Sequence, residues 1–187
     1  MAAISGASGM VYAKRLLEVL PKYYQQIYLS ASDNALKIAE HELNINSIQD
    51  LLPKDSSAYN IFSPDDMFAP PASGSHNYDG IVVVPCSMGM LGRIAAGVSD
   101  DLITRAVDVC IKERRKVILV VRESPYSLIH LKNMMTLTQA GAIILPASPA
   151  FYNHPQNISD MVDFVVSRII TSLGFESEII KGWGEDC

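Results

Sequence analysis

The sequence contains few side chains that form disulfides or bind metals, and they are not arranged as such sites require. Its three cysteines are odd in number and widely spaced: Cys86, Cys110 and Cys187. This pattern excludes a disulfide framework and favours a reducing, cytoplasmic compartment. The four histidines have no metal-ligand spacing: His41, His76, His130 and His154. No metal is therefore expected.

The sequence also lacks long apolar runs and an excess of basic residues. No run reaches the length of a membrane span, and residues 1–9 lack the basic start and apolar stretch of a signal peptide. The net charge is −5, and the 15 basic residues form no broad cationic stripe, which argues against a nucleic-acid partner. These absences favour a small-molecule enzyme or an oligomeric binder over a membrane protein.

What the chain does contain is an alternation of short β-rich runs and longer helical patterns, typical of parallel α/β domains. Its 187 residues, 49% of them hydrophobic, suit one domain over residues 1–187. The expected strands are 2–5, 27–30, a short one near 61, 81–84, 116–121 and 142–145. The expected helices are 10–20, 32–42, 88–96, 101–115, 127–140 and 159–174, the last capped by Ser159. The first strand is short, which leaves open whether the N-terminus is complete.

A glycine-rich turn, Gly6-Ala7-Ser8-Gly9, joins the first expected strand to a helix. Two glycines let the backbone approach an anion closely, and a helix start offers free N–H groups. The turn lacks the third glycine of a dinucleotide fingerprint. It is therefore either a tight packing turn or an anion site of another kind.

A second candidate lies at the end of the long irregular connection 43–78. There, the segment Ala69 to Ser75 is stiffened by two prolines, and Ser73 is one of several donors that it offers. Long connections inside compact domains are usually functional, although an ordinary surface loop has a similar composition.

A third candidate, Val84 to Ser87, ends a buried β-branched run, at the sheet edge where open α/β folds bind ligands. Ser87 can cap the next helix and donate to a ligand. Cys86 is either a buried structural cysteine or a nucleophile activated by the helix start.

The helix expected at 101–115 carries four charged residues along one face: Asp101, Arg105, Asp108 and Lys112. Spacings of three and four residues allow ion pairs within the helix. The sharper interpretation is a phosphate site, in which arginine offers a planar fork and lysine a mobile charge.

Arg122 and Glu123 directly follow the buried run 116–121, beside the expected ligand crevice. A carboxylate there, partly removed from water, can act as an acid or base, unless the segment is only a solvated loop. Tyr152 follows the last expected strand. Arg168 lies on the flank of the apolar stripe of the last helix. An arginine in that position is either part of a site or simply solvated.

Together these segments resemble the family of UbiX-type flavin prenyltransferases over essentially the whole chain. The matching stretches occur in family order and at family-like spacing: 5–9 (SGASG), 69–75 (APPASGS), 84–87 (VPCS), 102–105 (LITR), 112–115 (KERR), 122–125 (RESP), 127–131 (SLIHL), 144–147 (ILPA), 151–152 (FY) and 183–185 (WGE). One departure is Met67-Phe68, where relatives often carry a Trp. This departure bears on the size of the substrate that fits more than on the type of reaction.

The resemblance implies a flavodoxin-like Rossmann fold with three α/β/α layers and a mainly parallel sheet. It implies a homo-oligomer, a dodecamer, with FMN where subunits meet. Family members join reduced FMN to dimethylallyl phosphate or, in some, the pyrophosphate, without a metal. The prenyl group is attached to the flavin atoms N5 and C6, and phosphate is released. The product serves UbiD-type decarboxylases, and a flavin reductase is expected to supply reduced FMN.

The resemblance also assigns roles to residues. The expected FMN contacts are Gly6, Ala7, Ser8, Ser32, Ser87, Met90 and Arg105. The expected prenyl phosphate contacts are Ser73, Lys112, Arg122, Tyr152 and Arg168. Glu123 is expected to handle protons, assisted by Ser8 and Glu42. Basic side chains can stabilise a leaving phosphate without magnesium, and a dry pocket with π faces shelters an allylic cation.

Two other functions remain open. Flavin-dependent decarboxylases of cysteine-derived substrates resemble this fold, with a catalytic His after the second strand and a Pro-x-Met-Asn segment. Here only His41 lies near the first place, and the segment Pro146 to Pro149 lacks the Met-Asn pair. A flavin carrier or a decarboxylase subunit would bind FMN without turnover.

Overall fold

The computed structural model describes residues 1–180, which contain one six-stranded sheet whose strands are all parallel. Its strands are β1 (Ala2–Ile4), β2 (Ile27–Ala31), β3 (Tyr59–Ile61), β4 (Gly80–Cys86), β5 (Lys116–Val121) and β6 (Ile143–Pro146). They lie in the order β3-β2-β1-β4-β5-β6. Successive strands are therefore added in one direction from β1 to β3 and in the opposite direction from β4 to β6, and the order switches between β1 and β4. This is the strand order of Rossmann folds, in which ligands bind at the carboxyl ends of the two strands at that point.

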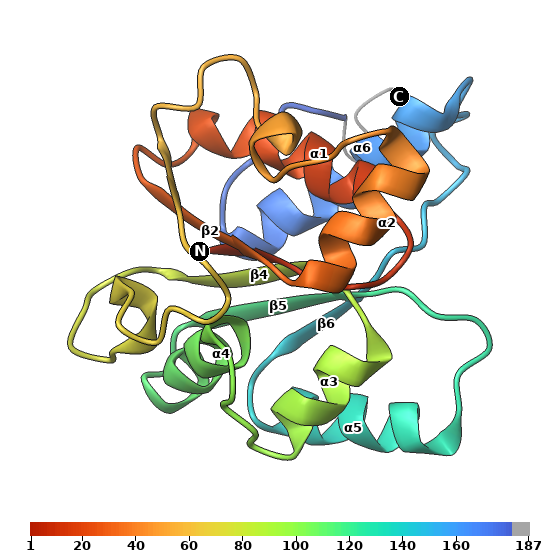
Figure 1. Ribbon diagram of the computed structural model, residues 1–187. Helices are drawn as coiled ribbons and strands as arrows, with labels where there is room; N and C mark the ends of the chain where they lie inside the picture. Colours follow the sequence, from red (N-terminus) through yellow and green to blue (C-terminus); the bar gives the residue numbers. More distant parts are fainter. Residues whose placement is uncertain (181–187) are drawn as a thin grey trace.

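Helices cover both faces of the sheet and make three layers (Figure 1). Three lie on one face: α1 (Met10–Val19), α2 (Asp33–Leu43) and α6 (Ile158–Leu173). Three lie on the other: α3 (Met88–Ala95), α4 (Leu102–Lys112) and α5 (Leu128–Gln139). Three short 3-10 helices complete the set: η1 (Leu20–Lys22), η2 (Gln49–Leu51) and η3 (Pro70–Ala72). The predicted three-layer Rossmann-type fold is confirmed.

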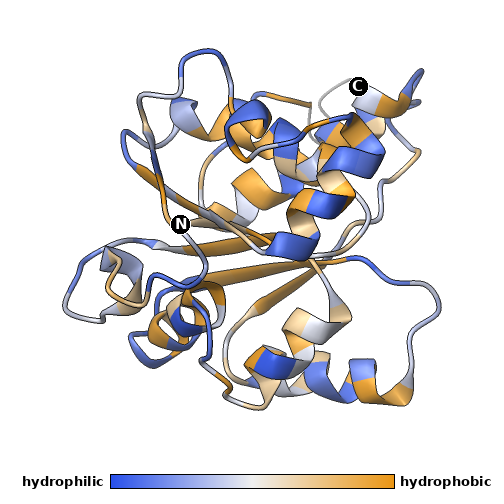
Figure 2. Ribbon diagram, in the orientation of Figure 1, coloured by the Kyte–Doolittle hydropathy of each residue, from blue (hydrophilic) through white to orange (hydrophobic). Residues whose placement is uncertain are grey.

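The strands are apolar because both of their faces are covered. In β4, Val82 and Val84 pack into the core beneath α1 and α6, whereas Ile81 and Val83 pack into the core beneath α3 and α4. Figure 2 shows the corresponding pattern, with apolar strands at the centre and helices that are apolar on one side only. Alternate strand residues therefore stabilise both layers, each fully buried side chain by about 1.5–3 kcal/mol.

The expected element boundaries hold to within one or two residues, with one wrong cap and one shortened helix. The last helix begins at Ile158, because the side chain of Asn157 accepts the Asp160 N–H at 3.1 Å; Ser159 lies inside the first turn. The charged helix ends at Lys112 rather than Arg115. The chain then turns through Arg114, whose φ is 58°, before β5 begins.

Candidate functional site

The carboxyl edge of the sheet brings the turns after β1, β2 and β4 together. Ala3 pairs with Val83 and with Ser30, so the three strands end side by side. The turns lead directly into α1, α2 and α3, and three helix N-termini therefore converge on this edge (Figure 1). Helix N-termini carry partial positive charge, so the edge is suited to an anionic ligand.

Ser5 ties two of these turns together and was missed in the sequence. Its hydroxyl donates to the Pro85 carbonyl at 3.0 Å and accepts the Ser87 N–H at 2.8 Å, and the residue is 1% exposed. A buried hydroxyl is stable only when it is hydrogen-bonded. The signal that could have revealed Ser5 in the sequence is its position, a polar residue at the end of a buried strand. Ser5 fixes the Gly6–Gly9 turn relative to Ser87.

Glu42 occupies the helix start that the glycine-rich turn was expected to keep free. Its carboxylate, near the end of α2, accepts the Met10 N–H at 2.8 Å and the Gly9 N–H at 3.0 Å. The expectation of unpartnered N–H groups at the start of α1 is therefore wrong at these two positions. Any ligand anion must use other donors on this edge.

The same contacts hold Glu42 in its charged form. Partial burial raises the pKa of Glu42, but hydrogen bonds from Ser8, Met10 and Gly9 and the nearby charge of Arg122 outweigh it and lower the pKa below its ordinary value. The structure thus brings the predicted residues Ser8, Glu42 and Arg122 together. A carboxylate with a lowered pKa is suited to accept hydrogen bonds and orient Ser8, not to donate a proton.

Ser32 and Ser87 cap the other two helices. Ser32 Oγ accepts the Ala35 N–H at 3.3 Å, and Ser87 Oγ accepts the Met90 N–H at 3.2 Å. Among the described residues, neither hydroxyl hydrogen has an acceptor, so both remain able to donate to a phosphate. The Met90 side chain is buried in the core, only 3% exposed.

Arg122 and Glu123 follow β5 at this edge, as predicted. The Arg122 N–H donates to the Cys86 carbonyl at 3.4 Å, which places the residue beside the end of β4. Its side-chain Nε is buried and has no hydrogen-bond partner among residues 1–180. Buried polar atoms are normally paired, so this donor indicates a missing acceptor such as a phosphate oxygen. Glu123 is half-buried, and its carboxylate accepts the Ser124 N–H at 3.0 Å.

Cys86 is not a nucleophile. Its side chain is fully buried, and burial raises the pKa of its thiol to about 12. A thiol needs to ionise to attack, so the structural interpretation of this cysteine is the correct one.

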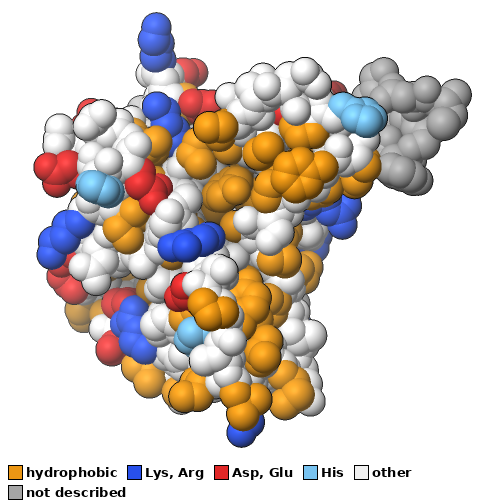
Figure 3. Space-filling view, turned by 90° about the vertical axis from the view of Figure 1, so that its right-hand side faces the viewer, with side chains coloured by type: hydrophobic (Ala, Val, Ile, Leu, Met, Phe, Trp, Pro, Cys, Tyr) orange, Lys and Arg blue, Asp and Glu red, His pale blue; other side chains and the backbone are white. Residues whose placement is uncertain are grey.

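Figure 3 views the molecule from the carboxyl edge of the sheet and shows exposed apolar side chains gathered there, with few charges among them.

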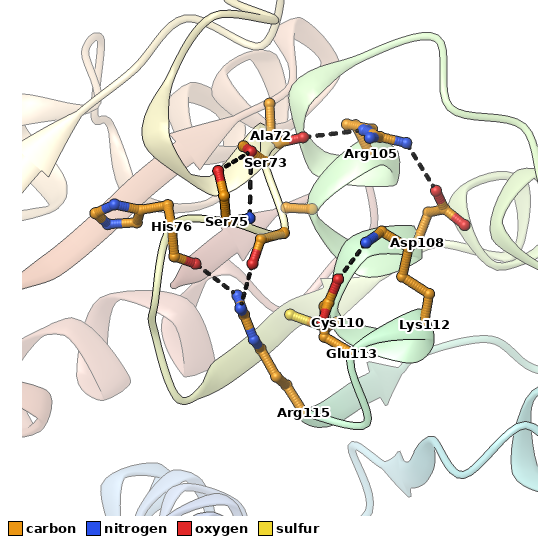
Figure 4. Close-up of polar contacts among 12 residues, drawn as sticks. Ala72, Ser73, Ser75, His76, Arg105, Asp108, Cys110, Lys112, Glu113 and Arg115 are labelled. Carbon is orange, nitrogen blue, oxygen red and sulfur yellow. Dashed lines mark hydrogen bonds and ion pairs between the residues drawn. The ribbon is translucent and has the colours of Figure 1, made fainter.

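Three predicted site residues lie at the opposite, amino edge of the sheet: Ser73, Arg105 and Lys112. Lys112 ends α4 just before β5 starts, and the Ser73 loop lies against that end of the helix. Arg105 Nε donates to the Ala72 carbonyl at 3.0 Å (Figure 4). One chain therefore does not bring these residues to Arg122 and Glu123.

The expected row of ion pairs along α4 is only partly present. Arg105 pairs with Asp108 at 3.0 Å. Asp101 instead caps the helix and pairs with Arg93 of α3 at 2.9 Å. Lys112 pairs with the adjacent Glu113.

Tyr152 and Arg168 lie on a third region, beside the edge strand β6. The Tyr152 ring contacts Phe164 edge-on at 5.9 Å between centroids. Arg168 is exposed one turn further along α6 and, with Phe164 and Leu145, lines a surface groove. The Ala147 N–H donates to the Val121 carbonyl, so this region adjoins the carboxyl edge at Arg122.

The described residues contain no cluster of three or more His, Cys, Asp or Glu side chains that could hold a metal ion. None of the helices in the described range is both long and apolar enough to cross a membrane. The matching stretch at Trp183 to Glu185 lies outside the described residues.

Comparison with known proteins gives consistent matches over nearly the whole chain. A family model described as Flavoprotein matches residues 1–170. The flavin prenyltransferase UbiX of Methanocaldococcus jannaschii is 48% identical over 97% of this chain and 96% of its own. Among solved structures, AnUbiX in complex with FMN and dimethylallyl pyrophosphate superposes with a TM-score of 0.91 at 36% identity, over 98% of this chain and 95% of its own.

A dodecameric FMN-dependent UbiX-like decarboxylase from Escherichia coli O157:H7 has a TM-score of 0.89 at 38% identity, with 98% of this chain and 99% of that chain covered. An FMN-dependent cysteine decarboxylase, TvaF, has a TM-score of 0.64 at 14% identity, over 93% of this chain and 96% of its own. The latter likeness concerns the fold alone.

Proposed function

Because the chain belongs to the family of UbiX-type flavin prenyltransferases, we propose that it joins a dimethylallyl group from dimethylallyl phosphate to N5 and C6 of reduced FMN and releases phosphate. The prenylated flavin then serves UbiD-type decarboxylases, and a flavin reductase supplies the reduced FMN. The protein acts as one flavoprotein domain over residues 1–187, in the cytoplasm. The observation that carries the proposal is the grouping of Ser8, Glu42 and Arg122 at the carboxyl edge of a chain so similar to these prenyltransferases.

The residues at the carboxyl edge fit FMN. Ser32 and Ser87 each retain a hydroxyl hydrogen at a helix N-terminus, which suits the flavin phosphate, whereas the start of α1 is already filled by Glu42. The buried Nε of Arg122 is left for the phosphate of the prenyl donor beside the flavin. The flavin supplies the nucleophilic nitrogen and carbon to which the prenyl group is joined.

The chain's own residues supply charge and proton handling. When the allylic C–O bond breaks, its electron pair leaves with the phosphate, and the positive charges of Arg122, Lys112 and Arg168 stabilise that leaving group. Glu123 exchanges protons through its carboxylate during phosphate loss and ring closure. Ser8, held by the Glu42 carboxylate, orients the flavin or relays a proton.

We propose that the complete site is shared between copies of the chain in a homo-oligomer, and specifically a dodecamer. The support is that Arg105, Lys112 and Ser73 lie at the opposite edge from Arg122 and Glu123. A second copy that presents its amino edge to the first copy's carboxyl edge completes the set. The solved UbiX-like protein from E. coli is a dodecamer.

The test is an anaerobic incubation of the protein with reduced FMN and dimethylallyl phosphate, followed by mass spectrometry of the released flavin. A flavin heavier by one C5 unit, with one phosphate released per flavin, is the expected result. Reactions without the donor, or with oxidised FMN, serve as controls. Bound FMN that never gains mass would instead mean a non-catalytic flavin carrier or decarboxylase subunit. Carbon dioxide release from a cysteine-derived substrate would favour the decarboxylase.

A further inference from the structure

The segment from Pro71 to His76, here called the serine loop, has its carbonyl groups held by side chains of the protein. Tyr78 Oη donates to the Pro71 carbonyl at 2.9 Å, and Arg105 Nε to the Ala72 carbonyl at 3.0 Å. Arg115 holds two more: its Nη2 donates to the Gly74 carbonyl at 2.8 Å and its Nη1 to the His76 carbonyl at 2.9 Å (Figure 4). Four carbonyls of one short loop therefore bind inward-facing donors.

Donor groups of the serine loop are left unused as a result. The Gly74 N–H has no acceptor among the described residues. The hydroxyls of Ser73 and Ser75 lie 2.8 Å apart, and since one donates to the other, one hydroxyl hydrogen remains. A backbone N–H and a hydroxyl hydrogen side by side are the donors that bind phosphate oxygens.

Lys112 lies directly against these donors. A Cβ atom added to Gly74 would stand 2.6 Å from Lys112 Nζ and closer still to Glu113 Oε1, so the loop backbone at Gly74 lies directly against the ends of these two side chains. Lys112 is paired here with Glu113, so a phosphate would have to replace the Glu113 carboxylate as the partner of the lysine. The unused donors and the Lys112 ammonium group then form one anion-binding surface, whose shape depends on what holds the carbonyls inward.

Arg115 is the residue best placed to set that shape. Its guanidinium centre lies 4.6 Å from the centroid of the Tyr78 ring, and the side chain is half-buried. The planar fork reaches two carbonyls two residues apart through two separate nitrogens, whereas lysine carries all of its donors on one nitrogen. Arg115 was part of a matching stretch in the sequence but was assigned no role.

We propose that Arg115 is a positioning residue that shapes the serine loop, so that the loop's donors and Lys112 bind the phosphate of the prenyl donor. This inference rests on the proposed function. Arg115 does not touch the ligand; it acts through the Gly74 and His76 carbonyls.

The chain provides a matched control in Arg114, which is adjacent, equally charged and exposed. Arg115→Gln and Arg114→Gln remove the same charge at neighbouring positions. Arg115→Gln is expected to raise the KM for dimethylallyl phosphate about tenfold or more, with kcat changed less than about twofold and the Kd for FMN unchanged. Arg115→Lys is expected to fall between wild type and Arg115→Gln, and Arg114→Gln to match wild type.

A loss confined to kcat, a weaker FMN affinity, or an equal effect of Arg114→Gln would overturn the proposal. If Arg115→Gln does not assemble, Arg115→Lys and Tyr78→Phe decide the same question, because Tyr78→Phe keeps the ring beneath Arg115 but releases the Pro71 carbonyl. Both should raise KM more than kcat changes, and unchanged KM values in both would refute the role.

Hydrogen exchange separates this inference from the proposed function. In the assembled protein, amides in the peptide 69–78 should exchange faster in Arg115→Gln than in Arg114→Gln, while those in the peptide 1–12 should not change. If the wild type makes no heavier flavin, the proposed function fails, and the exchange result still decides whether Arg115 shapes the loop. Unchanged exchange at 69–78 would refute it.

Discussion

The two edges of the sheet carry different kinds of chemistry. At the carboxyl edge, most donors are hydroxyls and helix N-termini, fixed by hydrogen bonds such as those of Ser5, and two carboxylates face them. At the amino edge, cationic side chains of α4 and the turn after it are held against the serine loop. In the proposed reaction, the carboxyl edge orients the flavin, exchanges protons and contributes Arg122, whereas the amino edge contributes positive charge through Arg105 and Lys112. The edges face away from each other, so a site that needs residues of both would take two copies of the chain.

The largest expected effect tests the carboxyl edge. Glu123→Gln should keep the fold and the FMN affinity but lose on the order of 10²–10⁴-fold in turnover, because an amide cannot exchange a proton at neutral pH. Single-turnover assays of flavin mass, beside FMN titration, measure both. Ser8→Ala should show a smaller defect. If Glu42→Gln lost turnover while Glu123→Gln did not, the proton chemistry would belong to α2.

Co-assembly of two defective variants tests whether the edges of different copies combine. At a dimethylallyl phosphate concentration that saturates the wild type but lies well below the Kd of Lys112→Ala, mixed oligomers of Glu123→Gln with Lys112→Ala should recover about a quarter of the wild-type rate, since random assembly restores that share of intact pairs of edges. Differently tagged copies, purified in tandem, allow the measurement. Glu123→Gln mixed with Arg122→Gln is the matched control and should stay inactive, because both changes lie on one edge. Equal recovery in both mixtures would contradict a shared site.

Removing one contact to the phosphate of the prenyl donor should have an effect of intermediate size, on the affinity for that donor. Lys112→Ala and Arg168→Ala should each weaken binding of dimethylallyl phosphate by about 1.5–3 kcal/mol, or roughly 10- to 150-fold, because each removes a charged hydrogen-bond donor. The Kd for FMN should change little, and titrations of each ligand separate the two affinities. Equal losses for both ligands would show that the two anion sites were assigned wrongly.

The smallest effect concerns stability at the carboxyl edge. Glu42→Gln should lower the free energy of unfolding by about 1 kcal/mol or less at neutral pH, because a largely exposed carboxylate that caps α1 is replaced by a weaker acceptor. Since folding lowers the pKa of Glu42, its contribution is present above the unfolded pKa and is lost as the pH falls through the folded value. Denaturant unfolding of the two proteins should therefore converge in acid. A difference that persists unchanged there would refute the charged cap.

The sequence predicted the elements well where burial on both faces made the pattern simple. The run 116–121 was expected as a strand and is β5, because every residue from Val117 to Val121 is buried. Caps were harder to place. Asn157 and Ser159 are both good cap residues two positions apart, and only the backbone geometry decides between them.

Contacts between distant segments could not be predicted from local patterns. Glu42 caps a helix that starts 32 residues earlier, and Ser5 joins a turn more than 80 residues away. The separation of Lys112 and Arg122 onto opposite edges, in contrast, could have been predicted from the sequence. Lys112 precedes the strand 116–121 and Arg122 follows it, so parallel strands require them to lie at opposite edges.

The opposite placement of the two edges also restricts the symmetry of the assembly. A two-fold axis makes every contact reciprocal, so two chains joined amino edge to carboxyl edge would have to form that contact twice at once, which edges that face away from each other do not allow. If an amino edge meets a carboxyl edge, the contact is head-to-tail, and it closes only through a rotation of higher order, such as a ring of three. Every chain in such a ring would contribute to two sites, so the number of complete sites would equal the number of chains.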